Sequence, residues 1–132
     1  MPTVVRKSFS ALTESRREII HAISWQVSAN IWRPPTDVYE TADAFVVKVE
    51  VAGMREEDFE VGIENNILMI GGMRPTLNER CAYYQMEIRS GKFEIAVEIP
   101  APIKVELSVA EYKDGFLMIN LPKVDQNQTG AE

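Results

Sequence analysis

The sequence of 132 residues is poor in the side chains on which most enzymes and metal sites depend. It contains one cysteine, Cys81, and one histidine, His21. A single cysteine excludes an internal disulfide framework and agrees with a reducing compartment, so we expect a cytoplasmic protein. A lone histidine does not supply the ligand set of a zinc site. We interpret His21 as a half-exposed residue of a helix.

Positive charge and long hydrophobic runs are also scarce. Fourteen basic residues against twenty acidic ones leave a formal net charge of −6. Proteins that bind nucleic acid need a basic surface that displaces counterions from phosphates, so we expect no nucleic-acid partner. No apolar run approaches the roughly 20 residues of a membrane-spanning helix, and Met1 to Ser10 lack the apolar core of a signal peptide. We therefore expect no membrane partner.

No group of residues forms a recognisable catalytic pattern. The acidic cluster of Glu56, Glu57 and Asp58 lacks the alternating ligands and central glycine of a calcium loop, and we interpret it as a solvated helical turn. Gly71-Gly72 is too short for a phosphate-binding loop and precedes no helix. Cys81 has no histidine near it in the sequence, which favours a passive thiol. The sequence predicts no catalytic residue, no metal site, no cofactor and no enzyme.

The sequence is rich, by contrast, in alternating apolar and polar residues. A period of two is typical of strands that bury one face, as in antiparallel sheets. Asn65-Asn66 and Asp114-Gly115 separate such segments, and these residue types tolerate the backbone of a two-residue hairpin turn. Several short strands with turns at close intervals predict an all-β fold, an immunoglobulin-like antiparallel β-sandwich. The clearest alternating segments are 45–51, 59–63, 93–99 and 103–109.

The chain divides into three expected regions. Residues 1–35 form a short N-terminal helical arm, because apolar residues recur at three- and four-residue spacing; Ile19, Ile23 and Val27 belong to this stripe. Residues 36–123 form the sandwich. Residues 124–132 form a short polar tail that we expect to be disordered.

Several apolar residues do not fit the main stripes of their strands. Val46, Phe116 and Met118 alternate with the residues that we expect in the core. One interpretation is that the N-terminal helix or a second subunit covers them. The other is an adhesive surface, since large exposed apolar patches usually mark interaction sites.

Five segments in order resemble one known family. They are Ala52 to Phe59, Asn66 to Arg74, Gly91 to Phe93, Ala110 to Leu117 and Leu121 to Lys123. Together they are similar to the alpha-crystallin domain of the small heat-shock proteins, of the bacterial and plant type. The resemblance covers about residues 36–123.

The resemblance implies an ATP-independent holdase chaperone that binds partly unfolded client proteins and prevents their aggregation. In this family a groove between the fourth and eighth strands accepts apolar peptide segments. Those strands correspond here to Phe59–Glu64 and Val105–Tyr112. The matching groove residues are Val61, Ile63, Leu107 and Val109, and ordinary core packing is the alternative for each.

The resemblance also implies a homodimer formed by strand exchange. The long stretch from Arg74 to Ser90 corresponds to a loop that adds a strand to the partner's second strand. The expected interface residues are Asp37, Val38 and Tyr39 with Tyr83, Tyr84 and Met86. The residues after Lys123 contain no I-x-I anchor of the kind that docks into a neighbouring groove. Higher oligomers would then form through the N-terminal arm, and the occupancy of the groove is left open.

Two other readings stay open. The chain is alternatively a co-chaperone-like β-sandwich adaptor that binds one folded partner, although the long loop with Tyr83 to Ile88 argues against this. A further alternative is a subunit that needs a related chain for assembly. The lack of a tail anchor keeps this alternative open.

Overall fold

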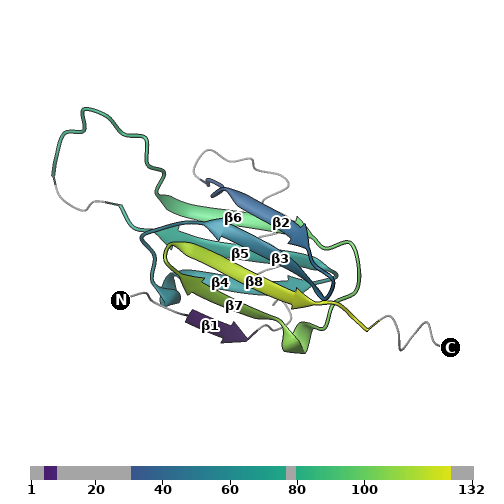
Figure 1. Ribbon diagram of the computed structural model, residues 1–132. Helices are drawn as coiled ribbons and strands as arrows, with labels where there is room; N and C mark the ends of the chain where they lie inside the picture. Colours follow the sequence, from purple (N-terminus) through teal and green to yellow (C-terminus); the bar gives the residue numbers. More distant parts are fainter. Residues whose placement is uncertain (1–4, 9–30, 77–79, 126–132) are drawn as a thin grey trace.

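The computed structural model describes residues 5–8, 31–76 and 80–125. The apolar stripe of Ile19, Ile23 and Val27 lies outside these residues, as do residues 126–132 of the expected tail. The described residues form eight strands and two short 3-10 helices (Figure 1), which are β1 Val5–Ser8, β2 Thr36–Glu40, β3 Ala44–Glu50, η1 Glu56–Asp58, β4 Phe59–Glu64, β5 Ile67–Arg74, β6 Gly91–Glu98, η2 Val105–Leu107, β7 Val109–Lys113 and β8 Phe116–Pro122.

The strands form two antiparallel sheets. The larger sheet has the order β1-β7-β8-β3-β2, and the smaller one has the order β4-β5-β6. Every pairing between neighbouring strands is antiparallel. The two sheets lie one over the other, with β3 and β8 in front of β4 and β5 in Figure 1. The predicted antiparallel β-sandwich is therefore confirmed.

The alternating apolar residues of both sheets meet in one core. Val47, Val49 and Ile119 of the larger sheet are fully buried, and so are Leu68 and Ile70 of the smaller sheet. Fully burying a side chain of this size stabilises the folded state by roughly 1.5–3 kcal/mol. The core accounts for the period of two, because only every second residue of a strand points into it.

The two predicted hairpin turns are present. Asn65 and Asn66 have φ angles of 54° and 61°, and Asp114 and Gly115 have φ angles of 55° and 85°. Positive φ at both central residues is the geometry of a type I′ turn, whose twist matches that of the flanking strands. The Asn66 side-chain amide also donates to the carbonyl oxygens of Ile99 and Ala101, at 3.2 and 2.9 Å.

One predicted strand is wrong. The alternation from Ile103 to Val109 predicts a continuous strand, but residues 105–107 form η2 and the strand β7 begins at Val109. The N–H groups of Leu107 and Ser108 donate to the carbonyl oxygens of Lys104 and Val105, each at 3.1 Å. The Ser108 hydroxyl also donates to the Lys104 carbonyl oxygen, at 3.0 Å. These local bonds satisfy the backbone without a neighbouring strand.

Only a small part of the first 30 residues lies within the described chain. Val5–Ser8 is the strand β1 and pairs with β7, which the sequence did not predict, and the helical stripe expected after it lies outside the described residues. The acidic cluster is the solvated turn that the sequence predicts, because Glu56–Asp58 is a 3-10 turn with no buried residue.

Candidate functional site

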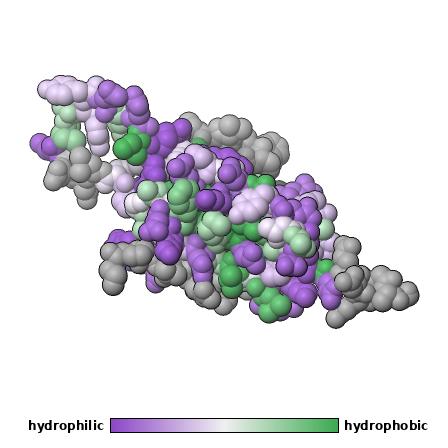
Figure 2. All heavy atoms as spheres, in the orientation of Figure 1, coloured by the Kyte–Doolittle hydropathy of each residue, from purple (hydrophilic) through white to green (hydrophobic). Residues whose placement is uncertain are grey.

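Apolar side chains reach the surface in a few places. Figure 2 shows hydrophobic residues both over the sandwich and on an arm that projects from it. Most of the exposed large side chains belong to the arm, which we define as residues 75–90, to β2 or to η2. They are Val38, Tyr39, Tyr83, Tyr84, Met86, Ile88 and Leu107. Apolar residues gathered at an edge and on a protruding loop are typical of interaction sites.

The described part of the arm forms no strand and extends away from both sheets (Figure 1). Tyr84, Met86 and Ile88 have exposed fractions of 103%, 63% and 78%. The chain bends at Tyr84 and Ile88, and their spacing of two residues would place all three on one face if the segment were drawn out as a strand. This face has no cover within the described chain, and it matches the pattern of a strand that lacks its sheet.

Arg74 holds the base of the arm. Its guanidinium donates to the carbonyl oxygen of Arg89 from Nε and Nη2, at 2.9 and 2.6 Å, and to that of Ala52 from Nη1, at 3.3 Å. The guanidinium carbon also lies 4.5 Å from the centre of the Trp32 ring. Trp32 in turn donates from its indole nitrogen to the Gly91 carbonyl oxygen, at 3.1 Å. The start and the end of the arm are thus fixed together.

Sequence reasoning missed this clamp because it joins four distant segments. In the sequence, Arg74 ends a family motif and begins the long loop, and no pattern sets Trp32 apart. The alternation of residues along a strand carries no signal for a bond between Arg74 and a loop backbone fifteen residues later. An arginine that ends a strand before a long loop is the only local hint.

The strand β2 is one of the two outer strands of the larger sheet. Within the described residues it pairs with β3 alone, in a register that places Val38 opposite Val47 and Tyr39 opposite Val46. Val38 and Tyr39 have exposed fractions of 46% and 44%. An outer strand with unpaired backbone groups is a template for another strand. The six expected interface residues, Asp37, Val38, Tyr39, Tyr83, Tyr84 and Met86, are all exposed, but the arm and β2 do not meet within one chain.

The four expected groove residues have different environments. Ile63 is buried in the core, with an exposed fraction of 3%. Val61 and Val109 are half-buried, and Leu107 on η2 has an exposed fraction of 57%. The rings of Phe59 on β4 and Tyr112 on β7 lie 4.9 Å apart, which shows that the two strands face each other across the sandwich. Ile63 is thus part of the core, whereas the other three side chains reach the surface in part.

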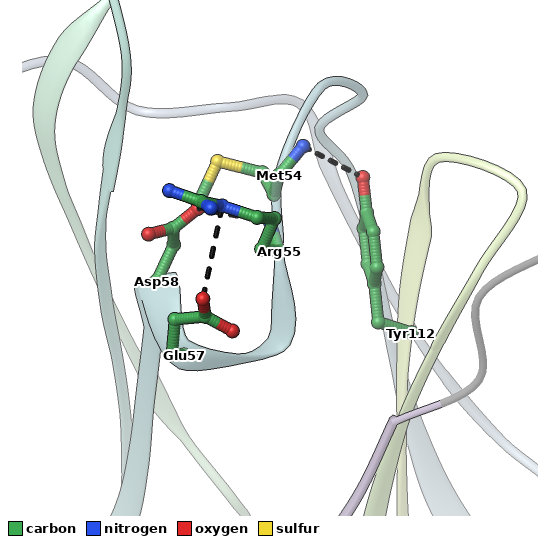
Figure 3. Close-up of polar contacts among 5 residues, drawn as sticks. All are labelled: Met54, Arg55, Glu57, Asp58 and Tyr112. Atoms are coloured by element: carbon green, nitrogen blue, oxygen red, sulfur yellow. Dashed lines mark hydrogen bonds and ion pairs between the residues drawn. The ribbon is translucent and has the colours of Figure 1, made fainter.

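The hydroxyl of Tyr112 fixes the loop that leads to β4. It donates to the Val51 carbonyl oxygen at 2.8 Å and accepts from the Met54 N–H at 3.3 Å, the contact drawn in Figure 3. The Arg55 N–H donates to the carboxylate of Asp58 at 2.9 Å, and the Arg55 side chain lies 3.8 Å from that of Glu57. The acidic cluster is therefore part of a tight turn that positions the start of β4.

Glu94 is a buried carboxylate that sequence reasoning also missed. It lies on β6 with an exposed side-chain fraction of 3%, and the Lys92 ammonium is 3.7 Å from its Oε2. Its other oxygen, Oε1, is buried without a hydrogen-bond partner. Burial raises the pKa of the Glu94 carboxyl, and the nearby Lys92 charge opposes this change in part. Alternation placed Glu94 on the outer face of β6, where burial is not expected.

The remaining candidates give no chemical site. Val46 is buried and Phe116 and Met118 are half-buried, with the Lys48 ammonium 4.5 Å from the centre of the Phe116 ring. Cys81 is an exposed free thiol on the arm. His21 lies outside the described residues. In the part of the chain that the structure describes, no three histidine, cysteine or acidic side chains gather as metal ligands, and no helix is long and apolar enough to cross a bilayer.

Comparison with known proteins gives one consistent family. The model of the Hsp20/alpha crystallin family matches residues 37–132. Small heat shock protein C2 of Rickettsia felis is 32% identical over 98 residues, which cover 73% of this chain and 64% of that protein. The match thus spans less than two thirds of that relative. Heat shock protein 16 of Schizosaccharomyces pombe is 31% identical over 132 residues, 97% of this chain and 89% of that protein.

The fold has solved counterparts. Heat shock protein 16.0 from Schizosaccharomyces pombe has a TM-score of 0.65 and 31% identity, over 70% of this chain and 88% of that chain. The overall fold is thus shared with a relative of known structure.

Proposed function

We propose that this chain, which belongs to the Hsp20/alpha-crystallin family, is an ATP-independent holdase of the cytoplasm. As a holdase it captures partly unfolded proteins. The observation that carries the proposal is the exposure of apolar side chains at the β2 edge, on the arm and on η2. Other apolar side chains form the core of the sandwich, so these exposed ones are not needed there. Unfolding proteins expose apolar segments and unpaired strands. Sheet edges and apolar surfaces bind both kinds of segment. Such capture needs no catalytic residue, cofactor or metal.

An aggregation assay tests this proposal. An aggregation-prone client is heated with the full chain, and its light scattering is followed with and without ATP. We expect suppression near an equimolar ratio that ATP does not change. A folded chain that suppresses nothing at any ratio would contradict the holdase and favour an adaptor or a subunit that needs a related chain.

We also propose that two copies exchange their arms. Within the described residues the outer edge of β2 offers backbone donors and acceptors, and the arm offers the exposed side chains of Tyr84, Met86 and Ile88, which a strand would carry on one face. The clamp of Arg74 reduces the freedom that the arm loses on binding, which favours association. Deleting Pro75 to Ile88 is expected to give monomers in solution scattering. A variant that is folded and still dimeric would refute the exchange.

The client surface that we propose lies where β4 faces β7. Leu107 is exposed, and Val61 on β4 and Val109 on β7 are half-buried. Ile63 supports this surface from the core. Leu107→Glu is expected to weaken client protection severalfold while the far-UV circular dichroism stays unchanged. Ala42→Glu adds the same charge to an exposed loop and serves as the control; equal protection by both variants would mean that clients bind elsewhere.

A further inference from the structure

The outer face of the smaller sheet has a hollow over β5, the strand that lies between β4 and β6 (Figure 1). Its volume is about 430 Å³, within the size range of small-ligand pockets. Met69, Gly71 and Met73 of β5 line it, together with Lys92 and Glu94 of β6. These residues alternate with those that point into the core, so the hollow lies on the side of the sheet away from the core. It shares no residue with the proposed client surface or with the arm exchange.

Gly71 gives the hollow its depth. A Cβ atom at this position would have one neighbour within 4 Å outside its own stretch of chain, the Phe93 carbonyl oxygen at 3.9 Å. A glycine inside a strand often marks a place where a ligand approaches the backbone. The register places Glu60 of β4 on one side of Gly71 and Glu94 of β6 on the other. One row across the sheet therefore carries two carboxylates with an open space between them.

Glu94 carries an unsatisfied oxygen at this hollow. Its side chain has an exposed fraction of 3%, and its Oε2 lies 3.7 Å from the Lys92 ammonium. Its Oε1 is buried and has no hydrogen-bond partner. A buried carboxylate oxygen without a donor is costly. A donor that enters the hollow would remove this cost.

The charges around the hollow favour a cation. The acidic residues of the lining are Glu57, Asp58, Glu60 and Glu94. Lys92 is the one basic residue among the described lining residues. The Arg55 Nε lies 3.8 Å from a carboxylate oxygen of Glu57 and 3.9 Å from one of Asp58, so it offsets these two charges. The row with Glu60 and Glu94 still has more negative charge than Lys92 balances.

We propose that this hollow binds an arginine side chain from an extended segment of another protein. A guanidinium has donors in several directions of one plane, so it can donate to the Glu94 Oε1 and reach the Glu60 carboxylate in the same row. It is also more weakly hydrated than an ammonium, which suits a buried carboxylate. The aliphatic part of the arginine would pack on Met69 and Met73, whose thioethers adapt to irregular shapes.

Two matched peptides test this site. Both are short and fluorescently labelled, with leucines around a central residue that is arginine in one and citrulline in the other. Citrulline has nearly the same shape as arginine without its charge. Fluorescence anisotropy against the full chain at neutral pH is expected to show at least about tenfold tighter binding of the arginine peptide, because a hydrogen bond to a charged group is a strong one. A peptide with a central lysine is expected to bind with intermediate affinity.

Variants of the full chain locate the bound arginine. Glu94→Gln removes the buried charge and is expected to weaken binding of the arginine peptide about tenfold. Glu98→Gln removes an exposed carboxylate of the same strand and is expected to leave the affinity unchanged. Lys92→Ala removes the competing cation and is expected to tighten binding. Gly71→Val fills the hollow without a change of charge and is expected to weaken binding.

Two results would overturn the inference. One is an arginine peptide that binds no more tightly than the citrulline peptide, or not at all, to the folded chain. The other is equal affinity of the Glu94→Gln and Glu98→Gln variants, each shown by circular dichroism to be folded. Client protection is measured separately with the natural chain. Its absence contradicts the holdase proposal and leaves the arginine site untouched, because the two use different residues.

Discussion

At the scale of single residues, Tyr112 joins a strand of one sheet to the loop that enters the other. Its hydroxyl contacts the backbone of Val51 and Met54, and both contacts are buried. Tyr112→Phe leaves these groups without a partner, and we expect the free energy of unfolding to fall by about 1–2 kcal/mol. Urea unfolding measures the change, and Tyr39→Phe on the exposed β2 edge is the control. An unchanged midpoint for Tyr112→Phe would contradict this account of the loop.

The buried carboxyl of Glu94 is expected to make the free energy of unfolding depend on pH. Because burial raises its pKa above the ordinary value of 4.5, the folded chain holds the proton more tightly than the unfolded chain. The contribution of Glu94 to stability is therefore fully present below that value and is lost as the pH rises through the raised pKa. The side chain of the Glu94→Gln variant cannot ionise. We therefore expect its free energy of unfolding to rise relative to that of the natural chain as the pH goes from about 4 to about 7.

Urea unfolding of both chains at the two pH values measures this difference. Glu98→Gln changes an exposed carboxylate of the same strand and serves as the control. If the difference between Glu94→Gln and the natural chain is the same at both pH values, Glu94 does not titrate with a raised pKa.

At the scale of elements, the arm offers a prediction about association. Met86 belongs to the apolar face that we propose to pack on a partner, whereas Gln85 points to the other side of an extended segment. Met86→Lys is expected to weaken the dimer at least tenfold, because a charge would be buried without a partner. Gln85→Lys adds the same charge on the other face and is expected to leave the dimer intact.

Size-exclusion chromatography with light scattering over a dilution series gives the dissociation constants. Equal dissociation constants for the Met86→Lys and Gln85→Lys variants would mean that this face does not form the interface.

The elements also show how far the sequence predicts the fold. The hairpins at Asn65-Asn66 and Asp114-Gly115 were predictable because a positive φ depends on local residue types. The strand expected from Ile103 to Val109 was wrong because an alternating pattern also fits a short 3-10 turn with local hydrogen bonds. The pairing of β1 with β7 joins residues about a hundred positions apart, and a four-residue strand carries too little periodicity to be found.

The candidate site was predictable only in part. Tyr84 and Met86 are expected at a subunit interface because they lie in the long loop; both are exposed in the single chain, and the interface stays a prediction. The burial of Ile63 and the exposure of Leu107 depend on how two sheets meet, which alternation within a strand does not describe. The clamp of Arg74 on Arg89 and Trp32 is likewise a tertiary contact.

At the scale of the whole molecule, stability and binding are assigned to different surfaces. The core between the sheets holds the fold, while the β2 edge with the arm and the apolar side chain of Leu107 on η2 carry the proposed contacts with a second copy and with clients. Edges are usually protected because they promote aggregation. A holdase needs such edges, and in the proposed dimer the arm of a partner would cover the β2 edge.

Direct isolation of a complex tests the central claim, that this chain captures unfolding proteins through its apolar edges. A client is heated with the full chain without nucleotide, cooled, and separated by size-exclusion chromatography with mass detection. The account predicts one soluble species that contains both proteins, in smaller amount for Leu107→Glu than for Ala42→Glu. A client that precipitates while the folded chain elutes alone would contradict it.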